Sequence, residues 1–424
     1  MLACSLSRVG SRGLLASTLA GPLSASIRFW LGWILLLCLT AAVLPAAAAE
    51  VASAASLAQA RAGHTSTLLA SGKVLVTGGY DSTSVLSSAT LYDPATNQWS
   101  AAGNLSEPLF AHTATVLPSG KVLVAGGRDS SGFSSDVAQL YDPVANSWSV
   151  VGVMHWYRAA HTATLLPSGK VLVAGGRNGP GIAFAETFDP STNTWSDASP
   201  MTTARFLHTA TLLPSGKVLV AGGYNGTTYV GSGELYDPST NSWSAASSLS
   251  FARSSHTATL LPSGKVLLAG GEDLNSYFGT AELYDPAANS WTPTQALIGA
   301  RYGHTATLLP SGKVLVAGGY GSAYLSSTEI YDPAAGTWSA GVALIAPRWG
   351  ATTTLLPSGL VFFAAGLGTG GAYLNSAELY DPANRGWGAT GALGTARGYH
   401  TTTLLATGKV LLAGGTSGGA LATG

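Results

Sequence analysis

The chain has 424 residues, only 9% of them are Asp, Glu, Lys or Arg, and the formal net charge is zero. Such a surface has no electric field that would gather nucleic acid or acidic lipid, so we exclude nucleic acid as a partner. Glycine (54) and proline (20) are abundant, and these residues supply the special backbone angles of tight turns. The composition therefore favours a chain of many short strands.

The first 49 residues differ from the rest of the chain. Three arginines precede an apolar run from Phe29 to Leu44, and a proline and four alanines follow it. This order predicts a signal peptide, residues 1–49, that is cleaved before Glu50. The alternative is an uncleaved membrane anchor, although the run is slightly short for a span. In both cases we expect export to a secreted or extracytoplasmic location (periplasm or cell surface), with no membrane span after cleavage.

Beyond residue 60 the sequence is periodic. The sixteen residues HTATLLPSGKVLVAGG occur three times, beginning at His161, His208 and His304, and related copies fill the rest of the chain. Glycine pairs begin at positions 78, 126, 175, 222, 270, 318 and 414, and Ala365-Gly366 takes the missing place. A period of 47 to 49 residues predicts an array of similar units, none of which can bury its apolar surface alone.

Each unit divides into four strands. Two short apolar runs, such as HTATLL and KVLVAGG, are joined by Pro-Ser-Gly, in which Pro presets the first turn angle and Gly closes the turn. A third strand ends in Tyr-Asp-Pro and a fourth carries a Trp. The second run is apolar on both faces, which suits an inner strand covered by a neighbour on each side. Four strands per unit at this period predict an all-β chain folded as a β-propeller.

These marks resemble the Kelch repeat family, whose blades have a Gly pair at the end of strand two, a Tyr in strand three and a Trp in strand four. The resemblance covers residues 61–415 and recurs seven times in full. It implies a propeller of four-stranded Kelch blades over residues 61–424 and, as in most members, a scaffold for binding. The strand-three aromatics are Tyr92, Tyr141, Phe188, Tyr236, Tyr284, Tyr331 and Tyr380, and the tryptophans are Trp99, Trp148, Trp195, Trp243, Trp291, Trp338 and Trp387.

The number of blades is open between seven and eight. Seven complete repeats are followed by a final HTTTLLATGKVLLAGG, His400 to Gly415, which supplies half an eighth. The N-terminal segment, residues 50–60, aligns with a fourth strand that has lost its Trp, with Val51 in the Trp position. As a ring-closing strand it would join the two termini in a composite eighth blade, which the strand count favours. Seven blades plus a spare hairpin is the alternative.

Length variation is confined to one part of the unit, between the Gly pair and strand three. In a meandering blade this loop lies on one face of the disc, and the other two turns share the opposite face. We therefore expect a specific site on the variable face. Aromatic rings with a few charged groups suit an extracellular protein or a glycan as partner. The candidate ligand-binding residues are Tyr80, Arg128, Arg177, Tyr224, Tyr229, Glu272, Asp273, Tyr277, Phe278, Tyr320, Tyr324 and Tyr373.

Seven repeat histidines occupy the same place in different units, so the symmetry of a ring spreads them apart. A metal needs three or four ligands that converge within about 2 to 2.5 Å. We therefore expect a structural hydrogen-bonding role for them and predict no metal, no cofactor and no catalytic residue. His155 lies outside the pattern and has no evident partner. The seven are His64, His112, His161, His208, His256, His304 and His400.

Glutamates in strand three suggest ion pairs. Each of them is followed 19 residues later by an arginine, and in the first unit both positions are lost together, as Thr90 and Leu109. We therefore predict a charge-assisted pair between each Glu and the next Arg, which would link strand three of one blade to the start of the next. The glutamates are Glu186, Glu234, Glu282, Glu329 and Glu378, and the arginines are Arg205, Arg253, Arg301, Arg348 and Arg397.

An enzyme is the alternative function. Some Kelch-like propellers are copper radical oxidases, whose cofactor is a Tyr crosslinked to a Cys. Both cysteines of this chain, Cys4 and Cys38, lie in the predicted signal peptide. The mature chain therefore has no thiol with which to form that cofactor.

Two further functions remain open. A carbohydrate isomerase needs only a few acid–base groups, for which Glu272 and Asp273 beside Arg177 and Arg128 are candidates, although a fold alone does not license a reaction. A structural surface or assembly module is the other, because near-identical repeats and low charge suit it.

Overall fold

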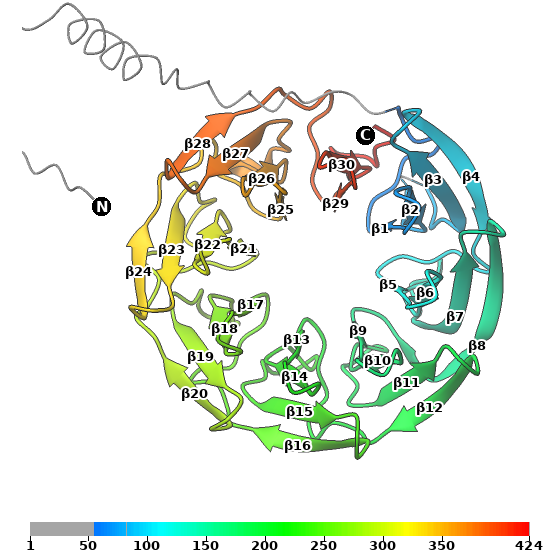
Figure 1. The fold of residues 1–424 in the computed structure, drawn as a ribbon, viewed down its shortest axis with the longest axis horizontal. Helices are drawn as coiled ribbons and strands as arrows, with labels where there is room; N and C mark the ends of the chain where they lie inside the picture. Colours follow the sequence, from blue (N-terminus) through cyan, green and yellow to red (C-terminus); the bar gives the residue numbers. More distant parts are fainter. Residues whose placement is uncertain (1–54, 82, 424) are drawn as a thin grey trace, which may run out of the picture. The chain divides into compact units, whose positions relative to one another are not determined.

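A computed structural model describes residues 55–81 and 83–423. The predicted signal peptide and the first residues of the 50–60 segment lie outside this part of the chain. The described residues form seven four-stranded antiparallel sheets and one two-stranded sheet, arranged in a ring (Figure 1). The expected all-β propeller is confirmed.

Each four-stranded sheet is a blade, numbered 1 to 7 along the chain, and the two-stranded sheet after them is the closing hairpin. The first strands are β1 (Thr65–Leu68), β5 (Thr113–Val116), β9 (Thr162–Leu165), β13 (Thr209–Leu212), β17 (Thr257–Leu260), β21 (Thr305–Leu308), β25 (Thr352–Leu355) and, in the closing hairpin, β29 (Thr401–Leu404). The second strands are β2 (Val74–Thr77), β6 (Val122–Ala125), β10 (Val171–Ala174), β14 (Val218–Ala221), β18 (Val266–Ala269), β22 (Val314–Ala317), β26 (Val361–Ala364) and, in the closing hairpin, β30 (Val410–Ala413).

Third and fourth strands complete the seven blades. The third strands are β3 (Ser88–Asp93), β7 (Ser135–Asp142), β11 (Ala185–Asp189), β15 (Gly233–Asp237), β19 (Ala281–Asp285), β23 (Thr328–Asp332) and β27 (Ala377–Asp381). The fourth strands are β4 (Gln98–Asn104), β8 (Ser147–Arg158), β12 (Thr194–Ala198), β16 (Ser242–Ala246), β20 (Ser290–Pro293), β24 (Thr337–Ala340) and β28 (Gly386–Ala389). One short 3-10 helix, η1 (Thr369–Gly371), lies between β26 and β27.

The ring has eight places, one for each first strand. Every first strand lies beside the first strand of the next blade, and β29 lies between β25 and β1 in the same way. Figure 1 shows the first strands around the centre and the fourth strands at the outer edge. The closing hairpin is therefore not a spare appendage, because seven four-stranded blades and this hairpin together make up the ring.

Residues 55–61 lie beside the end of the described chain. The amide of Leu57 donates a hydrogen bond to the carbonyl oxygen of Ala422. The equivalent bond in blade 1 runs from Leu105 N to Ser87 O at 2.8 Å. The 55–61 segment therefore takes the position that follows a fourth strand in a blade, next to the closing hairpin.

The core lies between successive blades. All residues of the second strands β2 to β26 are buried. In one cluster, Leu123 and Ala138 of blade 2 pack with Val171, Val173 and Phe188 of blade 3. Burying one large apolar side chain contributes about 1.5–3 kcal/mol. Inner strands that are apolar on both faces thus hold neighbouring blades together.

The glycine pair at the end of each second strand is required by close packing. Gly222 has a φ of 64°, and a Cβ there would lie 2.5 Å from Cε1 of His256 in the next blade. Only glycine combines this positive φ with such a close approach. In blade 7 Ala365 takes the position with a φ of 52°. An L-residue in this region costs about 1–2 kcal/mol.

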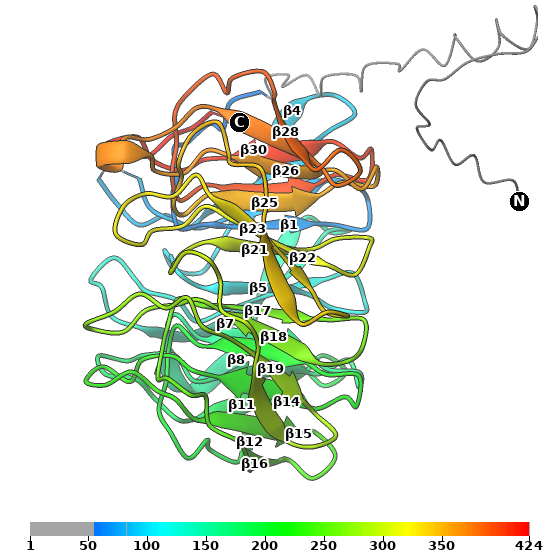
Figure 2. The same cartoon turned by 90° about the vertical axis from the view of Figure 1, so that its left-hand side faces the viewer.

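The two faces of the ring carry different connections. The turns between strands one and two and between strands three and four lie on one face, the turn face. The loops between strands two and three and the linkers between blades lie on the other, the loop face, because the blades are antiparallel meanders. Figure 2 shows the ring from its side, with η1 in orange projecting from the loop face. Among the described residues, no helix is long and apolar enough to cross a membrane.

Candidate functional site

Each repeated histidine forms a hydrogen bond to a threonine of the preceding first strand in the ring. Nε2 of His208 lies 3.0 Å from Oγ1 of Thr162, one blade earlier. The same contact joins His64 of blade 1 to Thr401 of the closing hairpin at 2.8 Å. Each imidazole therefore connects two neighbouring first strands, and the histidines are distributed around the ring.

Burial keeps these imidazoles neutral. Burial, followed by the positive charge of Arg205, lowers the pKa of His208 to about 3. The same causes, with Arg253 and Arg301 as the charges, lower the pKa of His256 and of His304 to about 3. A histidine with so low a pKa is poorly suited to acid–base catalysis near neutral pH. The histidines are thus part of the framework.

The histidine hydrogen bonds are interrupted at blade 7. Ala351 stands where the other units have a histidine, and Oγ1 of Thr305 in blade 6 has no hydrogen-bond partner among the described residues. Phe363 of β26 fills the space. Its Cζ lies 3.4 Å from the position that a Cβ on Gly318 would take. At other interfaces between neighbouring blades, which we call seams, the imidazole lies there. Aromatic packing therefore replaces the hydrogen bond at this seam.

The predicted pairing of each Glu with the next Arg is wrong. Glu234 pairs with Arg205, which opens its own repeat, and Nη2 lies 2.9 Å from Oε1. Arg253, the predicted partner of Glu234, pairs instead with Glu282 at 3.3 Å. The five buried pairs are Arg158 with Glu186, Arg205 with Glu234, Arg253 with Glu282, Arg301 with Glu329 and Arg348 with Glu378.

Antiparallel pairing of strands two and three explains this register. Arg205 precedes β13, and its guanidinium reaches the end of β14, where Nη1 donates to Gly222 O at 2.9 Å. β15 begins on the same face because it runs antiparallel to β14. Glu234 at its start therefore meets Arg205. Its Oε2 also accepts a hydrogen bond from the amide of Thr202 in the linker, so the pair fastens each linker to the blade that it enters.

Eight short ribbons line the inner rim of the loop face. Each rim ribbon has three positions joined by single β-bridges: the linker position before strand one, the position directly after the glycine pair, and a position in the following loop. The eight are Ala62–Tyr80–Val85, Phe110–Arg128–Ser134, Ala159–Arg177–Gly181, Phe206–Tyr224–Tyr229, Ser254–Glu272–Tyr277, Tyr302–Tyr320–Tyr324, Trp349–Leu367–Tyr373 and Gly398–Thr416–Ala420.

The rim ribbons carry most of the residues proposed from sequence. Ten of the twelve candidates occupy the second or third ribbon position. Asp273 follows Glu272, and its Oδ1 accepts hydrogen bonds from the amides of Asn275 and Ser276, so it shapes the loop. For Phe278 the structure differs from the expected site on the variable face. It is 9% exposed and lies under the guanidinium of Arg253, because the loop turns inward there to begin strand three.

Aromatic side chains join the ribbons of blades 5 and 6 to those beyond them. The rings of Tyr277 and Tyr302 are stacked, with centroids 5.2 Å apart, and Tyr302 meets Trp349 edge-on at 6.0 Å. Trp349 in turn contacts Tyr399, in the linker to the closing hairpin, at 6.3 Å. Such pairs add about 0.5–1.5 kcal/mol each beyond the area that they bury. We call the connected rings the aromatic belt: Tyr277, Tyr302, Tyr320, Tyr324, Trp349 and Tyr399.

The aromatic belt is accessible as well as packed. Tyr277 is 42% exposed and Tyr399 is 48% exposed. Tyr302, Tyr320 and Trp349 are partly buried. Ring faces that are held in place by their neighbours and still open to solvent can stack on a ligand with little loss of conformational freedom.

Sequence reasoning missed the linker position of the ribbons. Phe206, Tyr302 and Trp349 follow the Arg that opens the unit, and Phe110 follows Leu109 in the same position; the spacing from there to the Gly pair does not vary. Constant spacing places these residues in the uniform framework. The signal that would have found them is residue type, because this position is aromatic in four units and small in the other four.

Charged groups stand at separate points of the rim. Burial raises the pKa of Glu272 in blade 5, and the hydroxyl of Ser255 donates to its Oε1 at 3.0 Å. Burial and then the Glu272 charge raise the pKa of Tyr302 to about 12. Burial and then Arg128 lower the pKa of Arg177 in blade 3, which lies over the ring of Phe206. Among the described residues, no ion pair joins these arginines to Glu272, so the acid–base cluster suggested for an isomerase is not assembled.

His155 has a partner that the sequence did not reveal. Its Nδ1 lies 2.7 Å from Oδ1 of Asp197. With Glu186 they form the one group of possible metal ligands found among the described residues, with ligand atoms within 4.8 Å of one another. The Glu186 carboxylate already accepts hydrogen bonds from Arg158 and from the amide of His155. Contacts within the protein therefore explain why His155, Asp197 and Glu186 lie together.

Comparisons with known proteins agree with the architecture. A family model described as the KLHDC2/KLHL20/DRC7 Kelch-repeats domain matches residues 47–204, 111–299 and 160–363, which together span more than half of the chain. No curated protein matches the sequence. A solved structure of a fungal alcohol oxidase of the AA5 family, in complex with copper, is 21% identical over 74% of this chain and 73% of that chain, with a TM-score of 0.55. At this identity the likeness shows the fold alone.

The crosslinked cofactor of copper radical oxidases does not fit the described residues. They contain no cysteine to join to a tyrosine. The repeated histidines are each bonded within the ring, as His208 is to Thr162.

Proposed function

Because this chain belongs to the Kelch-repeat family, most of whose propellers serve as binding modules, we propose that it is an exported, non-catalytic binding protein whose ligand docks on the aromatic belt. The observation that carries the proposal is the contrast between framework and rim. The framework repeats the same His, Arg, Glu and Gly in unit after unit, whereas the rim ribbons differ from blade to blade at equivalent positions.

The ligand class that suits the rim is a protein or a glycan. Aromatic faces supply contact area with few rotatable bonds, and charged groups orient what is bound. Glu272 offers a carboxylate beside the belt, and Arg177 offers a guanidinium farther around the rim. A ligand that spans several blades would meet both.

Binding by matched tyrosine variants tests the site. Wild-type protein is screened on a glycan array and against displayed random peptides, and the best ligand is titrated against a Tyr302→Ala, Tyr320→Ala double variant. We expect at least a tenfold loss of affinity, since each aromatic anchor of a binding surface is worth about 2 kcal/mol. Tyr157→Ala is the control, because Tyr157 is 50% exposed on the outer strand β8. Unchanged affinity in the double variant contradicts the proposal.

Export is proposed from the N-terminal segment. The arginines and apolar run of residues 1–49 support a cleaved signal. N-terminal sequencing of the protein recovered outside the cytoplasm should give Glu50 as the first residue. Protein that stays inside the cell with residues 1–49 attached would show this part of the proposal to be wrong.

A further inference from the structure

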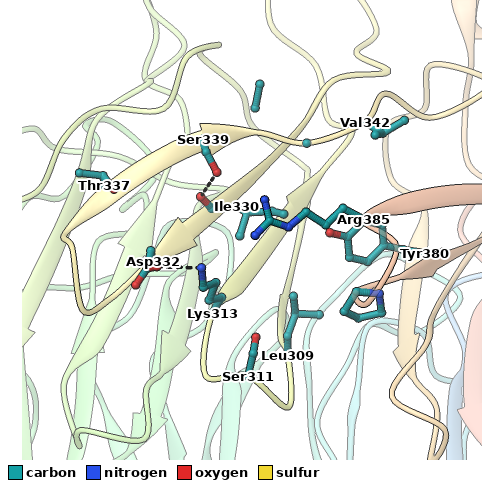
Figure 3. A pocket seen from close by; sticks show the side chains of 13 residues that line it. Leu309, Ser311, Lys313, Ile330, Asp332, Thr337, Ser339, Val342, Tyr380 and Arg385 are labelled. Carbon is teal, nitrogen blue, oxygen red and sulfur yellow. Dashed lines mark hydrogen bonds and ion pairs between the residues drawn. The ribbon is translucent and has the colours of Figure 1, made fainter. Parts of the chain in front are cut away.

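A cavity of about 460 Å³ opens between blades 6 and 7, on the turn face and away from the aromatic belt. Strand β24 and the turns of blade 6 form one side, and the turn between β27 and β28 forms the other (Figure 3). A volume of this size falls in the range of small-molecule sites, about 300–1,000 Å³. The lining includes Leu309, Lys313, Asp332, Ala340, Val342 and Arg385.

In other seams an asparagine bridges the corresponding gap. The side-chain amide of Asn241 in blade 4 donates to the carbonyl oxygen of Asp197 in blade 3 at 3.1 Å. Asn289 of blade 5 donates in the same way to Ala245 O of blade 4 at 3.1 Å. By position in the repeat, the equivalent residues at the 6/7 seam are Arg385 and Ala340.

A second side-chain contact that bridges neighbouring blades is also absent, among the described residues, at the seam between blades 6 and 7. Blade 6 has Gly336 in the asparagine position, and at that seam Gln295 of blade 5 reaches across, so that the amide of Trp338 donates to its Oε1 at 3.3 Å. The residue of blade 6 equivalent to Gln295 is Val342, which has no hydrogen-bonding side chain. The cavity thus lies at a seam where Arg385 and Val342 replace the asparagine and the glutamine.

Arg385 is an unfavourable residue for its backbone position. The equivalent positions in blades 1 to 5 are asparagines, and all of them have positive φ, as Arg385 does at 52°. Asn and Gly tolerate this region best, and a residue such as Arg pays about 1–2 kcal/mol there. Strained residues of this kind cluster at functional sites. The arginine thus lowers the stability of the turn in which it lies.

The charges of the cavity leave one cation unpaired. Nζ of Lys313 lies 2.8 Å from Oδ2 of Asp332, an ion pair that recurs in other blades, for example between Lys217 and Asp237. No ion pair of Arg385 occurs within the described residues. Figure 3 shows its guanidinium directed from blade 7 toward the blade 6 side of the cavity. A guanidinium is matched by a carboxylate through two parallel hydrogen bonds.

The other residues that line the cavity determine what kind of ligand body fits beside the carboxylate. Leu309, Ile330 and Val342 supply apolar surface, and the ring of Tyr380 closes one side. From the unpaired guanidinium, the missing bridge and this apolar wall, we propose that the seam cavity is a second binding site, for a small carboxylate with a short apolar body. The carboxylate is held by Arg385, and the body packs against blade 6.

Calorimetric titration of the full chain with 4-methylpentanoate tests this site. We expect saturable binding below a ligand concentration of about 10 mM. The neutral amide 4-methylpentanamide should bind at least tenfold more weakly, because it cannot form the charged pair. Acetate should also bind more weakly, because it lacks the apolar body. Absence of saturable binding, or equal affinity for the neutral amide, overturns the proposal.

Two variants locate the bound carboxylate. Arg385→Asn installs the side chain that closes other seams, so the protein should fold and lose at least tenfold in affinity. The Tyr302→Ala, Tyr320→Ala variant should bind 4-methylpentanoate as the wild type does, because the rim lies on the other face. Full affinity in Arg385→Asn, or loss of affinity in the rim variant, would show that the carboxylate binds elsewhere.

Discussion

Nη2 of Arg205 lies 2.9 Å from Oε1 of Glu234, 29 residues later in the chain. Both side chains are nearly inaccessible to solvent, and the pair anchors the linker from blade 3 to the body of blade 4. Removing one partner of a buried pair leaves an uncompensated charge and costs about 3–5 kcal/mol. The register of this pair therefore matters for the stability of the ring.

A double-mutant cycle measures which arginine Glu234 contacts. We expect Glu234→Gln and Arg205→Met each to destabilise the fold and to show a coupling energy above about 1 kcal/mol, since the residues are in direct contact. The cycle of Glu234→Gln with Arg253→Met should be additive within about 0.5 kcal/mol. Denaturant titration supplies the free energies of unfolding. Coupling of Glu234 to Arg253 in place of Arg205 would restore the register predicted from sequence.

Stability should fall as the pH drops below about 6.5. The pKa of His256 is lowered to about 3 in the folded protein, whereas an unfolded histidine has a pKa of about 6.5. Between these values the unfolded state binds more protons, so each buried histidine lowers the free energy of unfolding by up to about 1.4 kcal/mol per pH unit. A His256→Gln variant should lose stability less steeply between pH 6.5 and 3. The control is Leu267→Ala, which changes stability without changing this slope.

Ala365→Gly should stabilise blade 7 by up to about 1 kcal/mol. Ala365 holds a φ of 52° in the position where other blades have glycine, and glycine removes the steric cost of that backbone. The reverse change, Gly222→Ala, should destabilise by more than about 1 kcal/mol because its Cβ would meet His256. Thermal unfolding of the two variants compares them directly. A loss of stability in Ala365→Gly would mean that the buried methyl group outweighs the strain.

Ala351 and Phe363 should behave as a coupled pair. Ala351→His alone would force an imidazole into the space that Phe363 fills, and overpacking of this kind costs about 1–3 kcal/mol. Combined with Phe363→Val, the histidine can reach Oγ1 of Thr305, as histidines do in other seams. We expect the double variant to be more stable than Ala351→His. Additive free energies of unfolding would indicate that the two side chains do not share the space.

The fold could be predicted from sequence because its signals recur. Each strand pattern appears seven or eight times, so a weak signal in one unit is supported by the others. The ion-pair register could not be predicted because two readings fit equally well. Pairing with the next Arg explains the joint loss of Thr90 and Leu109, whereas pairing within the repeat explains the joint loss of Leu109 and Gln139. Only the antiparallel pairing of strands two and three selects the pairing within the repeat.

The candidate site could be predicted in part. Loop residues such as Tyr277 were found because their loops differ in length from unit to unit. Tyr302 and Trp349 were missed because they lie in linkers of constant length, although these linkers share a face with the variable loops. Contacts between blades, such as the stacking of Tyr277 on Tyr302, join residues of different repeats. Comparison of repeats position by position does not reveal such contacts.

Hydroxyl-radical footprinting tests the central claim most directly, that ligand binds on the aromatic belt. The reaction labels exposed tyrosine and tryptophan side chains, so it can be carried out with and without the best ligand from the glycan and peptide screens. We predict lower labelling of Tyr277, Trp349 and Tyr399 when the ligand is bound, with no change at Trp156 or Tyr157 on the outer strand β8. Protection of Trp156 and Tyr157 with unchanged labelling of the belt would contradict the claim.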